Sequence, residues 1–130
     1  MTQLVTVTLA EAPVVAAPDG SVVHVLGQVA GGSMATFTLA PGTVTQAVAH
    51  RSVAELWYVL AGQGSLWRKL AEEEQVTPLV PGTCVALPVG TRFQFRCDGA
   101  EPLRILGVTM PPWPGADEAY RVPGPWTPRL

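Results

Sequence analysis

Residues 42–62 read GTVTQAVAHRSVAELWYVLAG, and residues 82–97 read GTCVALPVGTRFQFRC. Each stretch follows a proline directly, and each contains runs of Val, Leu, Phe and Trp that alternate with other residues. Alternation with a period of two is typical of β-strands, because successive side chains point to opposite faces of the sheet. Both stretches are therefore predicted to form pairs of short strands joined by turns.

Turn-forming residues also recur through the rest of the chain. Turn signals such as Pro18-Asp19-Gly20, Gly31-Gly32 and Asp98-Gly99 separate short segments rich in Val, Thr, Leu and Phe. Segments at this spacing favour a sandwich or barrel, so the predicted fold class is all-β. Residues 70–75 are predicted to be a hairpin tip, with the acidic residues 72–74 in a solvated loop. The predicted strands are 21–28, 34–39, 44–50, 55–61, 65–70, 83–87, 92–96 and 103–110.

The composition narrows the class of protein further. Of 130 residues, 48% are hydrophobic and only 14% are charged, and the net charge is −2. The 8 Lys and Arg residues are scattered and form no basic patch, so nucleic acid is not an expected partner. The high hydrophobic content excludes solvated disorder, and 13 prolines argue against a helical bundle. We predict a single domain over 1–130, with a barrel core at about 20–110.

The last 20 residues, 111–130, differ in character from the barrel segments. They read PPWPGADEAYRVPGPWTPRL. Proline lacks a backbone N–H donor, so this stretch cannot be a paired strand throughout. Trp113 and Trp126 would form a sticky patch if both were left in water. We therefore predict an extended arm, held by its tryptophans against the barrel or against a second subunit.

The start of the chain and the cysteines bear on location. Residues 4–18 are apolar but lack a positively charged start and contain Glu11, which predicts strand and loop rather than a signal peptide. No uninterrupted apolar run approaches the roughly 18 residues of a membrane span, so no membrane is expected as a partner. Cys84 and Cys97 are predicted to be buried, reduced thiols. The expected location is cytoplasmic.

The two quoted stretches resemble the two conserved motifs of the cupin superfamily. The first motif places a Gly, a His-x-His pair, a Glu and a closing Gly at the spacing seen here, and the second contains Gly and Pro-x-Gly. The resemblance implies a jelly-roll barrel, also called a double-stranded β-helix, followed here by the Pro/Trp-rich arm. The matching residues are Gly42, His50, Glu55 and Gly62 in the first motif, and Gly82, Pro88 and Gly90 in the second.

The departures from the motifs concern the metal site that the resemblance implies, which consists of three His and one Glu. Val48 stands at the first His position, Phe93 at the His of the second motif, and Cys97 at its Asn. Catalytic zinc sites and non-haem iron sites keep three protein ligands. No metal or other cofactor is therefore expected. A divalent metal, if one binds, would be held by His50 and Glu55.

The resemblance also implies that one face of each strand looks into the barrel. An apolar pocket with a few convergent polar groups is typical of a small-molecule site, although side chains can also fill a small barrel completely. We therefore predict a metal-free or weakly metal-binding barrel that holds a small organic molecule, with a solid core as the alternative. The residues expected around the cavity are Gln46, Val48, His50, Glu55, Trp57, Phe93 and Phe95.

His50 and Glu55 are also the candidate catalytic residues, because neighbouring strands would bring them together. Two enzyme alternatives stay open. One is a metal-dependent oxygenase or isomerase with an incomplete ligand set, and the other is a metal-free isomerase in which His50 is the base. A buried pair without a catalytic role would show the same sequence pattern. The resemblance to cupins implies a homodimer. The apolar N-terminal segment and the C-terminal arm favour the same prediction, because both need a surface that covers them.

Overall fold

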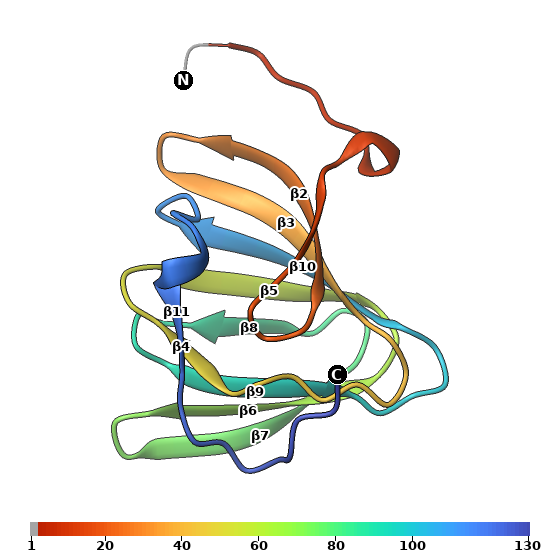
Figure 1. The fold of residues 1–130 in the computed structure, drawn as a ribbon, viewed down its shortest axis with the longest axis vertical. Helices are drawn as coiled ribbons and strands as arrows, with labels where there is room; N and C mark the ends of the chain where they lie inside the picture. Colours follow the sequence, from red (N-terminus) through yellow and green to blue (C-terminus); the bar gives the residue numbers. More distant parts are fainter. Residues whose placement is uncertain (1–2) are drawn as a thin grey trace.

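The computed structural model describes residues 3–130, which form two antiparallel sheets and two 3-10 helices of three residues each. One sheet has the strand order β1-β2-β3-β10-β5-β8, and the other has the order β11-β4-β9-β6-β7 (Figure 1). This architecture confirms the predicted all-β fold class. The strands are β1 Val14–Ala16, β2 Val22–Val29, β3 Gly32–Leu39, β4 Val48–His50, β5 Ala54–Ala61, β6 Gly64–Leu70, β7 Glu73–Leu79, β8 Cys84–Leu87, β9 Arg92–Cys97, β10 Leu103–Met110 and β11 Ala119–Arg121, and the helices are η1 Leu9–Glu11 and η2 Ala116–Glu118.

Strands that are distant in the sequence are neighbours in each sheet. β10 pairs with β3 on one side and with β5 on the other, and β9 lies between β4 and β6. These long crossings bring both quoted stretches and the end of the chain to the same region of the molecule. No helix within the described residues is long and apolar enough to cross a membrane.

The hydrophobic core fills part of the space between the sheets. Along β5 and β10 every second side chain is buried, as expected for strands with one face towards a core. The Trp57 ring lies edge-on to Phe95 and Phe93, with centroid distances of 4.8 and 5.5 Å, an arrangement that aromatic pairs prefer. The core residues are Leu39, Val48, Trp57, Val59, Leu66, Leu79, Val85, Leu87, Phe93, Phe95, Cys97, Leu103 and Ile105.

The predicted strand at 44–50 is regular only at its end, over Val48–His50. Val48 pairs with Phe93, whereas Val44 forms an isolated bridge with Arg96. From residue 44 to residue 48 the chain advances four positions, whereas its partner β9 advances only three, from residue 96 to residue 93. The segment before β4 therefore contains one extra residue. Such an insertion reverses the alternation of side chains, as in a β-bulge. Side chains before it, including Gln46, no longer share the face of Val48 and His50.

A strand that the sequence analysis missed follows the hairpin turn at 71–72. β7 runs from Glu73 to Leu79 and pairs with β6 along its whole length. Two of the three acidic residues predicted to lie in a loop, Glu73 and Glu74, therefore begin a strand. β7 is an edge strand with mostly exposed side chains, and an edge tolerates both charges and Pro78. Because an edge strand can be this polar, the composition of β7 resembles that of a loop.

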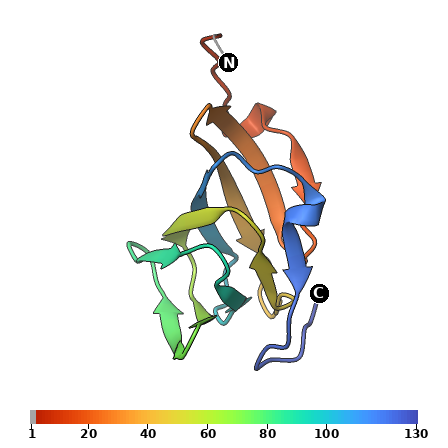
Figure 2. The same ribbon diagram turned by 90° about the vertical axis from the view of Figure 1, so that its left-hand side faces the viewer.

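The C-terminal arm packs on the barrel of its own chain (Figure 1 and Figure 2). Within the arm, β11 pairs with β4, so a short part of it is a strand after all. Gln94 is fully buried and holds the arm through its amide, which accepts from the Trp126 N–H at 3.1 Å and donates to the Trp126 carbonyl at 2.8 Å. The Arg96 guanidinium lies 4.2 Å from the centroid of the Trp126 ring.

The two cysteines differ in exposure. Cys97 is buried in the core, as predicted, whereas Cys84 is exposed on β8, so its predicted burial is wrong. The reason is the alternation of β8, which turns Val85 and Leu87 inwards and Cys84 outwards.

Candidate functional site

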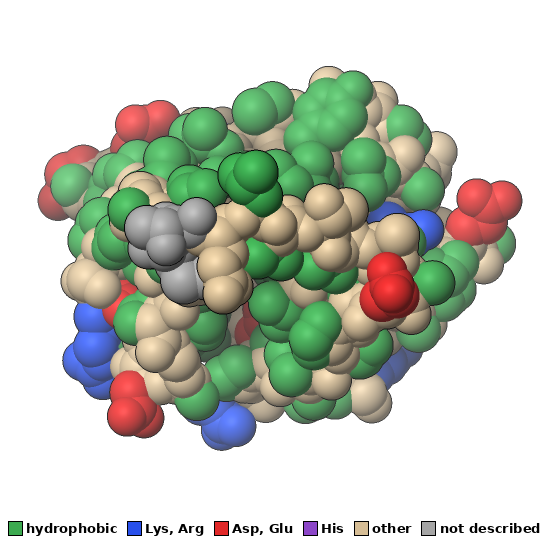
Figure 3. All heavy atoms as spheres, turned by 90° about the horizontal axis from the view of Figure 1, so that it is seen from above, with side chains coloured by type: hydrophobic (Ala, Val, Ile, Leu, Met, Phe, Trp, Pro, Cys, Tyr) green, Lys and Arg blue, Asp and Glu red, His purple; other side chains and the backbone are tan. Residues whose placement is uncertain are grey.

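A cavity of about 1010 Å³ lies at the end of the barrel bounded by β1, β2 and β3. The view from above shows that hydrophobic side chains dominate this face of the molecule and that the face is hollowed (Figure 3). The walls of the cavity are mainly apolar. They include Val15, Val23, Val25, Ala35, Phe37, Val48, Trp57, Phe93 and Trp113. The polar groups among the lining residues include Asp19, Ser21, Gln28, Ser33, His50, Glu55 and Thr109. The barrel is thus filled with side chains at one end and open at the other. The predicted cavity describes the open end, and the alternative of a solid core describes the filled end.

Five of the seven residues predicted around a cavity line this one: Val48, His50, Glu55, Trp57 and Phe93.

The other two predicted cavity residues lie elsewhere. Phe95 is buried in the core behind Trp57 and is not among the lining residues. Gln46 borders a separate pocket of about 360 Å³ between β9 and the C-terminal arm. Its placement in the main cavity was wrong because the extra residue before Val48 reverses the alternation on which the prediction depended.

His50 at the end of β4 and Glu55 near the start of β5 face each other in the cavity. The His50 Nδ1 atom lies 3.3 Å from the Glu55 Oε1 atom, and the two side chains are 8% and 4% exposed. The other carboxylate oxygen, Oε2, accepts a hydrogen bond from the indole N–H of Trp57. The His50 ring is packed edge-on between Phe93 and Trp113, at centroid distances of 5.2 and 5.0 Å.

Burial shifts the pKa values of this pair in opposite directions. It raises the pKa of Glu55 to about 7; the Trp57 hydrogen bond opposes this rise, and the Asp19 carboxyl adds to it. Burial also lowers the pKa of His50 to about 4, against the attraction of Glu118. Near neutral pH the imidazole is therefore uncharged and the carboxyl is partly protonated. The arrangement is therefore not a fixed ion pair.

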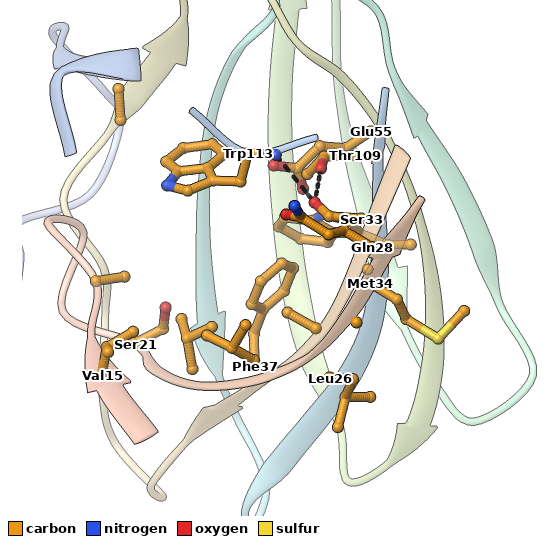
Figure 4. Close-up of a pocket in the computed structure, with 18 of the residues that line it drawn as sticks. Val15, Ser21, Leu26, Gln28, Ser33, Met34, Phe37, Glu55, Thr109 and Trp113 are labelled. Carbon is orange, nitrogen blue, oxygen red and sulfur yellow. Dashed lines mark hydrogen bonds between the residues drawn. The ribbon is translucent and has the colours of Figure 1, made fainter. Parts of the chain in front are cut away.

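Trp113, Ser33 and Thr109 are cavity residues that the sequence analysis did not identify. Ser33 on β3 and Thr109 on β10 are cross-strand partners, and their hydroxyl groups are hydrogen-bonded to each other. The Trp113 backbone N–H donates to Ser33 Oγ at 3.0 Å, which fixes the first part of the arm over the cavity (Figure 4). The Pro/Trp composition predicted an arm held by its tryptophans, but no local pattern in the sequence pairs the arm with β3.

Asp19 is another lining residue that the sequence indicated only as part of a turn. It precedes β2, and its Oδ1 atom accepts hydrogen bonds from the Ser21 backbone N–H at 2.9 Å and from the Ser21 hydroxyl at 2.7 Å. This local bonding of an Asp to the backbone two residues on is common in turns. Burial raises the pKa of Asp19, although both Ser21 bonds oppose the rise. The turn thus places a second carboxyl at the cavity.

The donor groups at the cavity do not fit a resident metal ion. Val48 and Phe93 are direct partners across β4 and β9, and they place apolar side chains beside His50. The local donors are therefore one imidazole and one carboxylate, fewer than the three protein ligands of catalytic zinc or non-haem iron sites. Within residues 3–130, no group of three or more His, Cys, Asp or Glu side chains is placed to hold a metal.

The fold and the cavity define a small β-barrel protein with a buried His–Glu pair at an open end. A family model described as the cupin domain matches residues 35–109, which is more than half of the chain. The chain therefore belongs to the cupin domain family, and the resemblance of the two motifs to cupins is confirmed. No curated protein matches the sequence significantly.

Several solved structures are similar to this chain in fold. Pac13, described as a nucleoside dehydratase, has a TM-score of 0.72 and 17% identity over 93% of this chain and 92% of its own. A variant of Streptomyces Pac13, solved with uridine, has a TM-score of 0.73 and 16% identity over 94% and 92%. Oxalate decarboxylase of Bacillus subtilis has a TM-score of 0.69 and 16% identity, covering 79% of this chain but 29% of the enzyme.

Proposed function

We propose that this protein binds a small organic molecule in the cavity of the barrel, without a resident metal ion. The observation that carries the proposal is the cavity of about 1010 Å³, which is at the upper end of the roughly 300–1,000 Å³ typical of small-molecule sites. Its apolar walls would supply affinity, and the few polar groups would fix the orientation of the ligand. A nucleoside is one candidate by size, and the likeness in fold to the uridine-bound Pac13 variant supports testing it.

The cavity walls suit a flat ligand. Phe37 and Trp113 present aromatic rings on different sides of the cavity, and Glu55 lies beyond them (Figure 4). A planar ring between these side chains would make the large contacts that aromatic residues favour. The polar end of the same ligand would then reach Glu55 and His50.

A second candidate function is acid–base catalysis by the His50–Glu55 pair. It is favoured by the pKa of Glu55, raised to about 7 by burial, because a general acid or base works best when its pKa is near the operating pH. His50, whose pKa is lowered to about 4, is a weaker base than the sequence analysis expected. In this proposal Glu55 takes a proton from the substrate and returns it, as in an isomerisation, and His50 orients the carboxyl.

We also propose that two copies form a homodimer through the outer face of the six-stranded sheet. Leu56, Tyr58 and Leu60 are exposed large apolar side chains on this sheet, and Leu56 lies opposite Val108 of β10. Apolar patches of this kind mark interaction surfaces. The C-terminal arm gives no argument for a dimer, since it packs on its own barrel. A Leu56→Glu variant should elute as a monomer with multi-angle light scattering, whereas Val76→Glu on β7 should not alter the oligomeric state.

Native mass spectrometry of protein taken directly from the expression host tests the binding proposal. We expect an additional small-molecule mass that is released on unfolding. An Ala35→Phe variant, which places a ring in the cavity, should lose this mass while the protein stays folded. Identical spectra for the wild type and Ala35→Phe would contradict binding in this cavity.

A further inference from the structure

The cavity lining contains carboxyl groups but no Lys or Arg side chain among the described residues. Asp19 and Glu55 both line the cavity, and the Asp19 carboxyl adds to the rise in the pKa of Glu55. None of the 8 Lys and Arg side chains of the chain is among the described lining residues. His50 is the one lining side chain among these residues that could carry a positive charge, and burial lowers its pKa to about 4. Above about pH 7, where the Glu55 carboxyl loses its proton, the described lining therefore carries negative charge without a protein counter-ion.

The two carboxyls belong to different parts of the cavity. Ser21, which holds Asp19, and Glu55 lie on opposite sides of the cavity, with Phe37 and Trp113 between them (Figure 4). Both Ser21 bonds end on the Oδ1 atom of Asp19, so a ligand donor could approach the Oδ2 atom. One Glu55 oxygen is bound by Trp57, and the other faces the His50 imidazole. Each carboxyl is thus fixed by a neighbour and can still accept a further hydrogen bond.

The aromatic side chains of the cavity also favour a positively charged group. The rings of Phe37, Trp57, Phe93 and Trp113 all border the cavity. The face of an aromatic ring attracts a cation, and the attraction grows when the cation is removed from water. A ligand anion would meet two acidic groups and no cationic partner, and an unpaired buried charge is costly.

We propose that the ligand of this cavity carries a positively charged amine attached to an apolar, ring-sized body, and that phosphorylated or carboxylated molecules are rejected. This inference rests on the proposed function, because it names the chemical class bound at the same site. The ammonium group would lie against Asp19 or Glu55, and the apolar body would lie against the aromatic walls.

Isothermal titration of the full chain near pH 8 with three matched probes tests the inference. The probes are 2-phenylethylamine, 2-phenylethanol and 3-phenylpropanoate, which share a ring and a two-carbon linker and differ in the charge of the end group. We expect the amine to bind at least about tenfold more tightly than the alcohol, and the carboxylate to bind most weakly. The Asp19→Asn variant keeps the acceptor for Ser21 and should lower the preference for the amine. Glu55→Gln should also lower it, and Glu101→Gln at an exposed position should not.

The outcomes separate the two proposals. If the alcohol or the carboxylate binds as tightly as the amine, the cavity is a binding site and the preference for a cation is wrong. If the amine is preferred but neither Asp19→Asn nor Glu55→Gln lowers the preference, the charge inference is again wrong. If none of the three probes binds, the charge inference is contradicted, whereas the proposed small-molecule function is contradicted only if native mass spectrometry also finds no ligand that Ala35→Phe removes.

Discussion

His50 Nδ1 lies 3.3 Å from Glu55 Oε1, yet the two groups do not form a permanently charged pair. Burial raises the pKa of the carboxyl to about 7 and lowers the pKa of the imidazole to about 4. Between these values the carboxyl holds the proton and the imidazole is neutral. The pair therefore keeps a buried proton at the cavity without a fixed charge, which suits either binding or proton exchange.

Replacing Glu55 by Gln should stabilise the protein at alkaline pH. The folded-state pKa of Glu55, about 7, lies above the ordinary value of 4.5, so the folded state binds more protons between these values and stability falls as pH rises through them. Glu55→Gln does not titrate and keeps an acceptor for Trp57. We expect its free energy of unfolding to exceed that of the wild type by about 3 kcal/mol above pH 7, and to be nearly equal to it below about pH 4.5.

Urea unfolding of both proteins between about pH 4 and pH 9 measures this difference. Glu101→Gln, at an exposed position, serves as the matched control and should follow the wild type at every pH. A Glu55→Gln variant that is less stable than the wild type at about pH 8 would show that the buried carboxylate is stabilised by its surroundings.

Introducing two imidazoles beside His50 should create a four-ligand metal site. Val48 and Phe93 are cross-strand partners next to His50, so the double variant Val48→His/Phe93→His would place three imidazoles beside Glu55. We expect this variant to bind about one equivalent of Zn²⁺ or Ni²⁺ by elemental analysis after dialysis, because three His and one carboxylate complete a four-ligand set. The wild type, purified without a metal-affinity step, should hold far less. Stoichiometric metal in the wild type that is lost in His50→Ala would contradict the metal-free proposal.

A methyl group at Gly107 should make the cavity smaller. A Cβ atom there would lie 2.5 Å from Phe37 Cε2 and 3.5 Å from Trp57 Cδ1, so the Phe37 ring must move. Because Gly107 and Phe37 both line the cavity, we expect Gly107→Ala to weaken binding of 2-phenylethylamine by about tenfold or more, a change of about 1.4 kcal/mol. Gly31→Ala is the control, since a Cβ at Gly31 meets nothing within 4 Å. Equal affinities for the two variants would place the ligand away from Phe37.

Removing the Glu118 carboxylate should loosen the arm and the turn between β4 and β5. Glu118 accepts hydrogen bonds from the Ser52 N–H at 2.6 Å, the Ser52 hydroxyl at 2.6 Å and the Val53 N–H at 3.1 Å. We expect Glu118→Ala to lower the free energy of unfolding by about 2–4 kcal/mol, because three donors lose a charged acceptor. Glu101→Ala should have little effect.

The pH dependence gives a second check on Glu118. Burial by itself would raise the pKa of Glu118, but the bonds from Ser52 and Val53 and the attraction of His50 lower it below the ordinary value of 4.5. Its contribution is therefore present above pH 4.5 and is lost as pH falls through the lower folded-state pKa. The difference between wild type and Glu118→Ala should shrink in acid, and a constant difference down to about pH 2 would contradict this role.

Much of the fold follows from local signals in the sequence. The regular turns and the period-two alternation of 55–61 and 103–110 identify strands with one buried face. The first motif places His50 and Glu55 in consecutive strands, and the structure brings the two residues together although β4 and β5 belong to different sheets. These features are predictable because each depends on residues within a few positions of one another.

The features that were missed depend on contacts between distant segments. Nothing local marks the extra residue that turns Gln46 away from the cavity, since it shows only in the register against β9. Trp113 reaches the cavity through Ser33, a contact that spans 80 positions in the sequence. The sequence around Asp19 is typical of an ordinary turn. The burial of Asp19 depends on the sheets around it, so no local pattern predicts it. The charge of the cavity therefore could not be inferred from the motifs alone.

A crystal structure of the protein grown with 2-phenylethylamine tests the central claim, that the cavity binds an apolar amine, most directly. We predict one ordered ligand with its ring against Phe37 and Trp113 and its ammonium group within hydrogen-bond distance of Asp19 or Glu55. A cavity that contains only water at saturating ligand, or a ligand ordered elsewhere on the molecule, would contradict it.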